Sequence, residues 1–131
     1  MITEDYVSFE IAKLLKEKGF DVECDCFYVD GELVIARGGA SNWNIGETLF
    51  TDYKNECSAP TLQMTMKWLR KKHKLYIVIR PYVTEEGFFS LFDIKSLKEK
   101  EIVVNLRTKT GFNTHEEACE AAIKYCLENL I

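Results

Sequence analysis

The chain has 131 residues, of which 47% are apolar and 29% are charged. This length and composition are typical of one globular domain and exclude an intrinsically disordered chain. The net charge of −4 excludes a general electrostatic attraction to nucleic acid or anionic lipid, so binding of either would need a local basic patch.

The N-terminal segment and the cysteines indicate the compartment. Met1–Asp5 carries neither a basic region nor an apolar run, so we expect no signal peptide, and no apolar stretch is long enough to span a bilayer. Five cysteines without an export signal indicate free thiols in a reducing compartment. We therefore expect a cytoplasmic protein that has no membrane partner.

The first predicted element is a helix over about residues 4–18, with Thr3 as its N-cap and Gly19 as its C-terminal stop. Its apolar residues recur at helical spacing and should face the core; they are Val7, Ile11, Leu14 and Leu15. Tyr6 and Phe9 depart from this stripe and lie nearer the charged face. Exposed aromatic residues are typical interface anchors, so we expect both to contact another subunit or a partner.

A β-hairpin should follow the first helix. Residues 20–28 alternate between apolar and acidic side chains, as in a half-buried strand, and Asp30-Gly31 supplies a tight turn into a second strand over 33–36. The pattern then dissolves over 37–57, where turn-forming residues dominate. This long loop is a candidate binding loop and is expected to hold a short strand near 48–53.

The remaining pattern predicts a helix, three strands and a last helix. The second helix should open at Ser58 or Ala59, with Leu62, Met66, Leu69 and His73 facing inward. A central strand should cover 75–80, with its pairing ending or bulging at Pro81, and strands over 88–94 and 102–107 should follow. Thr114 and Glu117 match a capping box that opens the last helix. The residues expected to face inward in that helix are Ala118, Cys119, Ala122, Tyr125, Cys126 and Leu130.

These elements follow the order α-β-β-loop-α-β-β-β-α. Short connections between consecutive strands favour antiparallel pairing. We therefore expect one α+β domain over residues 1–131, with a mostly antiparallel sheet of about five strands and three helices on one face.

Three segments carry a resemblance to other proteins. Ser8–Asp21, Ser58–His73 and Glu116–Ile131, about a third of the chain, resemble a group of uncharacterised small proteins of Bacteroides-type gut bacteria and their prophages or mobile elements. The middle segment is the most specific, with Ala59-Pro60-Thr61 followed by Trp68-Leu69-Arg70. The resemblance implies a bacterial or phage origin and brings no catalytic or binding residue with it.

The cysteines offer two kinds of chemistry. Cys24-Asp25-Cys26 could form half of a metal site, but the second ligand pair that zinc needs is missing, and packing in the core is the favoured interpretation. Cys57 is expected in a loop just before the second helix, where the helix dipole would favour a thiolate. Paired with His73 or His115, it is the remaining candidate nucleophile. We expect no cofactor.

The second helix carries the clearest binding signal. Lys67, Arg70, Lys71 and Lys74 gather on one face, and Trp68 lies beside them. Phosphate contacts together with an aromatic stacking group are what a nucleic-acid surface requires. The alternative is a solvated helix face whose lysines suit the negative end of the helix dipole.

The sequence alone therefore leaves three hypotheses. The first is a non-enzymatic accessory or binding protein of a bacterial or prophage genome, whose partner is another protein or a second copy of the chain. The second is a nucleic-acid-associated protein that uses the basic helix face. The third is a small enzyme that uses the Cys57 thiol.

Overall fold

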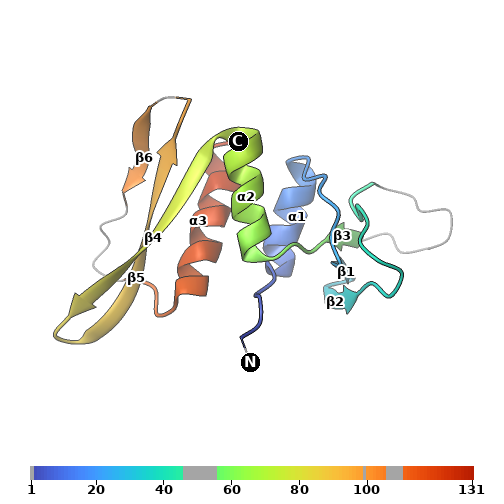
Figure 1. Cartoon of the computed structure of the whole chain (residues 1–131), viewed down its shortest axis with the longest axis horizontal. Helices are drawn as coiled ribbons and strands as arrows, with labels where there is room; N and C mark the ends of the chain where they lie inside the picture. Colours follow the sequence, from blue (N-terminus) through green and yellow to red (C-terminus); the bar gives the residue numbers. More distant parts are fainter. Residues whose placement is uncertain (1, 46–55, 99, 106–110) are drawn as a thin grey trace. The chain divides into compact units, whose positions relative to one another are not determined.

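The computed structural model describes residues 2–45, 56–98, 100–105 and 111–131, with the backbone alone for 101–105 (Figure 1). The chain divides into two compact units, Met1–Thr61 (unit 1) and Leu62–Ile131 (unit 2), and each is described by itself. The expected α+β class with three helices and antiparallel strands is confirmed. The single sheet is wrong, because the six strands of the described residues form two three-stranded sheets.

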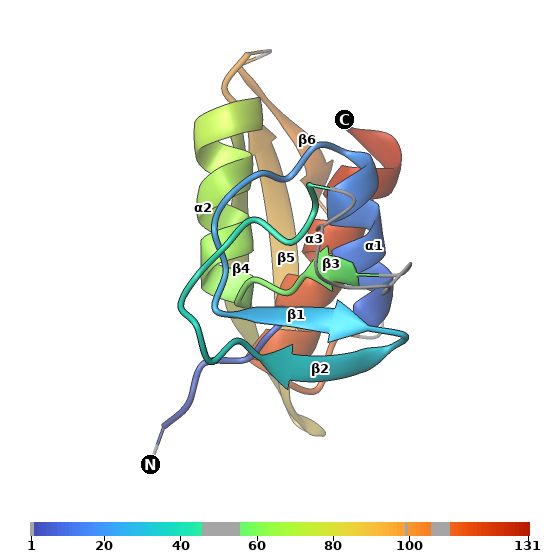
Figure 2. The same cartoon turned by 90° about the vertical axis from the view of Figure 1, so that its right-hand side faces the viewer.

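Unit 1 consists of one helix and a small sheet. Helix α1 spans Phe9–Glu17, and the strands are β1 (Cys26–Val29), β2 (Glu32–Ile35) and β3 (Glu56–Ser58). Both strand pairs are antiparallel and the order is β2-β1-β3, so β2 and β3 are the two edges (Figure 2).

Helix α1 begins later than expected and ends where expected. Its N-cap is Ser8, whose Oγ accepts a hydrogen bond from the Ile11 amide at 3.3 Å. The predicted start at Thr3 is wrong because the preceding segment is extended, with the Val7 amide donating to the Pro60 carbonyl at 3.0 Å. At the other end Gly19 has φ 83°, and the Phe20 amide donates to the Leu15 carbonyl, which closes the helix in a Schellman motif.

The predicted hairpin is confirmed at its turn. Asp30 and Gly31 both have positive φ, 50° and 85°, as a type I′ turn requires. The long first strand is wrong in its N-terminal half, since β1 begins only at Cys26 and Cys24 makes an isolated bridge to Ser41. The alternation holds in part, since Phe20, Cys24, Cys26 and Tyr28 are buried but Val22, on the same predicted face, is exposed.

Strand β3 was not expected. Residues 56–58 pair with β1, with Cys57 opposite Tyr28, and the backbone bonds continue as the Ala59 amide donates to the Cys26 carbonyl. Because these residues are extended and bonded, the second helix opens at Leu62 rather than at Ser58 or Ala59. The strand expected near 48–53 lies outside the described residues.

Unit 2 places two helices on one face of an antiparallel sheet (Figure 1). The helices are α2 (Leu62–His73) and α3 (His115–Asn129); the strands, in the order β4-β5-β6, are β4 (Leu75–Thr84), β5 (Gly87–Ser96) and β6 (Glu101–Asn105). The cap of α3 is confirmed, since Thr114 Oγ1 accepts a hydrogen bond from the Glu117 amide at 3.1 Å. Two residues expected to face inward, Tyr125 and Leu130, are only half-buried, and Ile123 and Leu127 fill the core instead.

Strand β4 is an edge strand that continues through Pro81, so the predicted central strand, with its pairing ending or bulging at this proline, is wrong. Pro81 lies opposite Ser90, whose amide and carbonyl both bond to Phe112 on the other side of β5. Pro81 therefore occupies a position that needs no amide hydrogen toward β5, and its nitrogen faces the open edge.

Candidate nucleic-acid interface

The two units carry opposite net charge. Of the 21 acidic and 17 basic residues, unit 1 holds twelve acidic and five basic, whereas unit 2 holds nine acidic and twelve basic. Their net charges are therefore −7 and +3, which together give the −4 of the whole chain. The overall acidity thus hides a unit whose sign suits an anionic partner.

Helix α2 separates apolar from basic residues. Leu62, Met66 and Leu69 are buried, as their spacing predicts. The opposite face carries the predicted basic residues: Lys67, Lys71 and Lys74 are exposed, and Arg70 is partly exposed. Burial of the apolar stripe thus leaves these charges facing away from the core.

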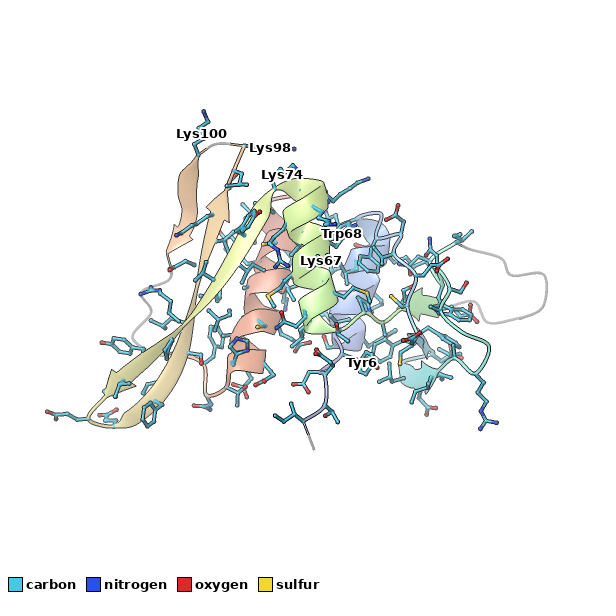
Figure 3. All side chains as sticks on the ribbon, viewed as in Figure 1. Tyr6, Lys67, Trp68, Lys74, Lys98 and Lys100 are labelled. Atoms are coloured by element: carbon cyan, nitrogen blue, oxygen red, sulfur yellow. The ribbon has the colours of Figure 1, made fainter. Side chains whose placement is uncertain are left out.

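The turn between β5 and β6 brings Lys98 to the end of α2, and Lys100 follows in the same turn. The Leu97 amide donates to the Lys74 carbonyl at 2.9 Å, so Lys98 follows directly at this end of the helix (Figure 3). Lys98 lies close enough to His73 to act on it: burial first, and then the charges of Lys98 and Lys72, lower the pKa of His73. The members of this basic cluster are Lys67, Arg70, Lys71, Lys72, Lys74, Lys98 and Lys100.

The sequence carries a signal for the position of Lys98. The turn at Glu85-Glu86 leaves two strands of ten residues each, and antiparallel pairing across it necessarily returns residue 97 to a position beside residue 74. Counting the register from the turn at Glu85-Glu86 therefore places Lys98 beside the end of α2.

Among the described side chains, the ion pairs of unit 2 do not involve the basic cluster. They are Arg80 with Asp93, at 2.7 Å, and Lys124 with Glu128, at 3.9 Å. The lysines of the cluster are exposed and can therefore meet an external anion.

Two lysines of the cluster occupy unfavourable backbone positions. Lys74 and Lys100 have φ of 57° and 56°, in the left-handed region where glycine is preferred. Among the described non-glycine residues, the third with positive φ is Asp30 in the hairpin turn. A lysine kept at such a position is a feature that folding alone does not favour.

No protein-family model, curated protein or solved structure matches the chain. The candidate interface is therefore defined by the geometry and charge of the basic cluster. Within the described part of the chain, none of the helices has the length and apolar character of a membrane-spanning segment.

Trp68 does not take the stacking role expected for it. Its side chain is buried, with 6% of its surface exposed, and its ring lies edge-on to His73 with centroids 4.8 Å apart. The expectation that Trp68 stacks on an unpaired base is wrong, because at position 68 the helix turns the indole toward the core. Among the described residues of α2, the interface is left with cations and no exposed aromatic ring.

Tyr6 and Phe9 lie partly outside the core of unit 1, as expected. Tyr6 is 39% exposed and forms an isolated bridge with Thr61, and Phe9 is half-buried against Tyr28, with ring centroids 5.4 Å apart. A hydrogen bond to Cys26 is the main reason that the pKa of Tyr6 is raised. Contact of these two aromatic residues with a partner stays a prediction.

All five cysteines are unbridged and buried, which confirms the predicted free thiols and the core interpretation of Cys24 and Cys26. Burial raises the pKa of Cys24 and of Cys126 to about 12 and that of Cys119 to about 11. In the described residues no group of three or more His, Cys, Asp or Glu is placed to hold a metal ion.

Cys57 lies in strand β3 and not in a loop at a helix start, so that part of the prediction is wrong. It is 2% exposed, and burial raises the pKa of its thiol. Both features oppose formation of a thiolate at neutral pH.

The described part of the loop after β2 has a structural role. The Trp43 amide donates to Ser58 Oγ and its indole donates to the Cys24 carbonyl, both at 2.9 Å. Asn44 accepts from the Ser58 amide and donates to the Phe20 carbonyl, also at 2.9 Å. These side chains satisfy buried backbone groups, so over residues 41–45 the loop holds the unit together.

Proposed function

We propose that the chain is a non-enzymatic binding protein and that its basic cluster binds the phosphate backbone of a nucleic acid. The observation that carries the proposal is the position of Lys98, which joins the end of α2 from a distant part of the sequence. The net charge of +3 on unit 2, the absence of ion pairs in the cluster among the described residues, and the two lysines with positive φ support it.

The chemistry of the cluster determines what kind of binding to expect. Lysine and arginine contact phosphate oxygens and release condensed counterions, which gives affinity without sequence readout. Because Trp68 is buried, no exposed ring of the described α2 residues is available to stack on a base. We therefore expect duplex and single strands to bind without a strong preference for either.

The test compares two double variants that remove the same charge. Lys67→Gln with Lys71→Gln removes two members of the cluster, and Lys13→Gln with Lys124→Gln removes two lysines elsewhere. Fluorescence anisotropy with a labelled duplex, over a series of salt concentrations, gives the slope of log affinity against log salt. Since each phosphate contact contributes roughly 0.9 to that slope, the cluster variant should flatten it by about two units.

The control variant should keep the slope and affinity of the wild-type protein. Absence of binding at low salt would contradict the proposal, and so would an equal loss in both variants. Circular dichroism should be unchanged in both, because none of the four lysines is buried.

Origin and location complete the proposal. We infer a bacterial or prophage protein from the resemblance of the three segments, and a cytoplasmic location from five unbridged cysteines. In this setting the protein would act as an accessory factor. Recovery of the native protein from the cytoplasmic fraction of its host, with all thiols reduced, is the expected result.

A further inference from the structure

His73 lies within the basic cluster and is the titratable group there whose charge can change near neutral pH. It is the last residue of α2, between Lys72 and Lys74 in the chain. The Leu97 amide donates to the Lys74 carbonyl, which holds the turn that carries Lys98 at the same end of the helix (Figure 3). A proton gained at His73 would therefore add a positive charge among the cations of the cluster.

The surroundings of the imidazole favour its neutral form. The side chain of His73 is half-buried, and its ring lies edge-on to the buried ring of Trp68, with centroids 4.8 Å apart. Its Nε2 atom is closed to solvent and has no hydrogen-bond partner among the described residues. A protonated ring would carry an N–H at this atom, and a buried N–H without a partner costs free energy.

The charges that act on His73 come from two elements, and both are positive. Lys72 precedes it in α2, and Lys98 approaches from the turn between β5 and β6; after burial, these two charges lower the pKa of His73. Strand β4 and helix α3 also pack against α2, but within the described residues neither contributes a charge that acts on this pKa. An anion bound to the two lysines would offset the repulsion that they exert on a protonated ring.

A bound phosphate would change the two causes of the low pKa unequally. Its negative charge offsets the charges of Lys72 and Lys98, which raises the pKa of His73. It also displaces water, which acts in the opposite direction. However, Nε2 is already closed to solvent in the free protein, so little further desolvation remains at this atom. The loss of repulsion is therefore the larger change, and the pKa of His73 should rise in the complex.

We propose that phosphate binding at the basic cluster takes up one proton at His73, so that the affinity for nucleic acid increases as the pH falls below neutral. The proton comes from solvent and forms the second N–H bond of the ring. This uptake rests on the proposed function, because it acts on the same cluster. A ligand binds more tightly as the pH falls wherever its complex holds more protons than the free protein.

Fluorescence anisotropy with a labelled duplex, at one salt concentration and at pH 7.5, 6.5 and 5.5, measures this effect. If binding returns the pKa of His73 to its ordinary 6.5, the wild-type affinity should rise by up to about tenfold between pH 7.5 and 5.5. His73→Gln should remove this rise, because glutamine takes up no proton. The matched control is His115→Gln, since His115 is the second histidine of the chain and lies exposed in the first turn of α3; it should keep the rise.

Proton NMR provides the second readout. The ring Cε1 protons of the two histidines give separate titration curves, and the two glutamine variants assign them. The midpoint of His73 should move to higher pH when the duplex is added, whereas the midpoint of His115 should change little. Circular dichroism at each pH should show the same folded spectrum.

The results distinguish the uptake of a proton from the binding itself. Equal affinity at the three pH values, or a rise that persists in His73→Gln, would overturn the proton uptake and leave the proposed function intact. A His73 midpoint that stays in place when the duplex binds would overturn it as well. Absence of binding at low salt at every pH would overturn the proposed function, and the proton uptake with it.

Discussion

A lysine in a left-handed backbone position costs folding free energy that a glycine would not. Lys74 and Lys100 both have this left-handed conformation, and both belong to the basic cluster. The left-handed conformation is disfavoured by about 1 kcal/mol for a residue with a Cβ atom. Strain of this kind concentrates at functional positions, so we expect these residues to link stability to the proposed binding.

Replacing Lys74 or Lys100 by glycine should therefore change stability and binding in opposite directions. We expect the free energy of unfolding to rise by up to about 1 kcal/mol in urea titrations, because the backbone strain is relieved. Affinity for a DNA duplex should fall, with the salt slope flatter by roughly 0.9. Lys98→Gly is the matched control, since φ of Lys98 is not positive; it should weaken binding without raising stability. Stabilisation by this control would contradict the argument.

The half-buried His73 makes stability depend on pH. Burial, Lys98 and Lys72 lower its pKa below the ordinary 6.5, so the unfolded chain binds the proton more tightly than the folded protein. The stabilising contribution is complete above pH 6.5 and is lost as the pH falls through that value toward the folded pKa. Urea titrations between pH 7.5 and about 5 should show this loss, and His73→Gln should reduce it. An unchanged pH dependence in the variant would contradict the assignment to His73.

The thiols should be unreactive in the folded protein. All five are buried, and burial raises the pKa of Cys24, Cys119 and Cys126 far above neutral pH. Ellman's reagent should therefore detect few thiols under native conditions and five after denaturation without reductant. Fewer than five in denaturant would reveal a disulfide and exclude the free-thiol state.

At the scale of elements, several local signals were correct, whereas the helix starts expected at Thr3 and at Ser58 or Ala59 and the features that depend on non-local pairing were not. Gly19, Asp30-Gly31 and Thr114 act through the backbone within four residues, and the sequence located the helix end, the turn and the cap correctly. Strand β3 has three residues and exists because β1 pairs with it, so no local periodicity marks it. The burial of Trp68 and the arrival of Lys98 likewise depend on packing and register.

Gly111, which precedes α3, packs closely against strand β5. A Cβ at Gly111 would lie 2.6 Å from the Phe89 Cβ and 3.3 Å from the Ser90 carbonyl, and the next residue, Phe112, is bonded to Ser90 through the backbone. Gly111→Ala should therefore lower the free energy of unfolding by about 1–3 kcal/mol, measured in urea. Gly38→Ala is the control, since a Cβ there meets nothing within 4 Å and the effect should be small. Equal effects of the two variants would show that Gly111 is not tightly packed.

At the scale of the whole molecule, the net charge of −4 does not indicate whether an anionic partner could bind. It is the sum of −7 on unit 1 and +3 on unit 2. The boundary that separates these charges is not marked by a linker. Strand β3 ends at Ser58 and α2 begins at Leu62, and the residues between are bonded to unit 1: the Pro60 carbonyl accepts from Val7, and Thr61 bridges to Tyr6. A boundary without a flexible linker is atypical of independent domains.

The expected single domain leads to the last prediction, which is that both units unfold together. Each unit has only 60–70 residues, a length at which an isolated core is marginally stable. Each also contains one tryptophan, Trp43 in unit 1 and Trp68 in unit 2. Labelling with 5-fluorotryptophan gives two ¹⁹F resonances, and the variants Trp43→Phe and Trp68→Phe assign them. In urea, the two folded resonances of the wild-type protein should disappear with one midpoint, as a two-state transition requires. Two separate midpoints would show that the chain contains two domains that fold independently.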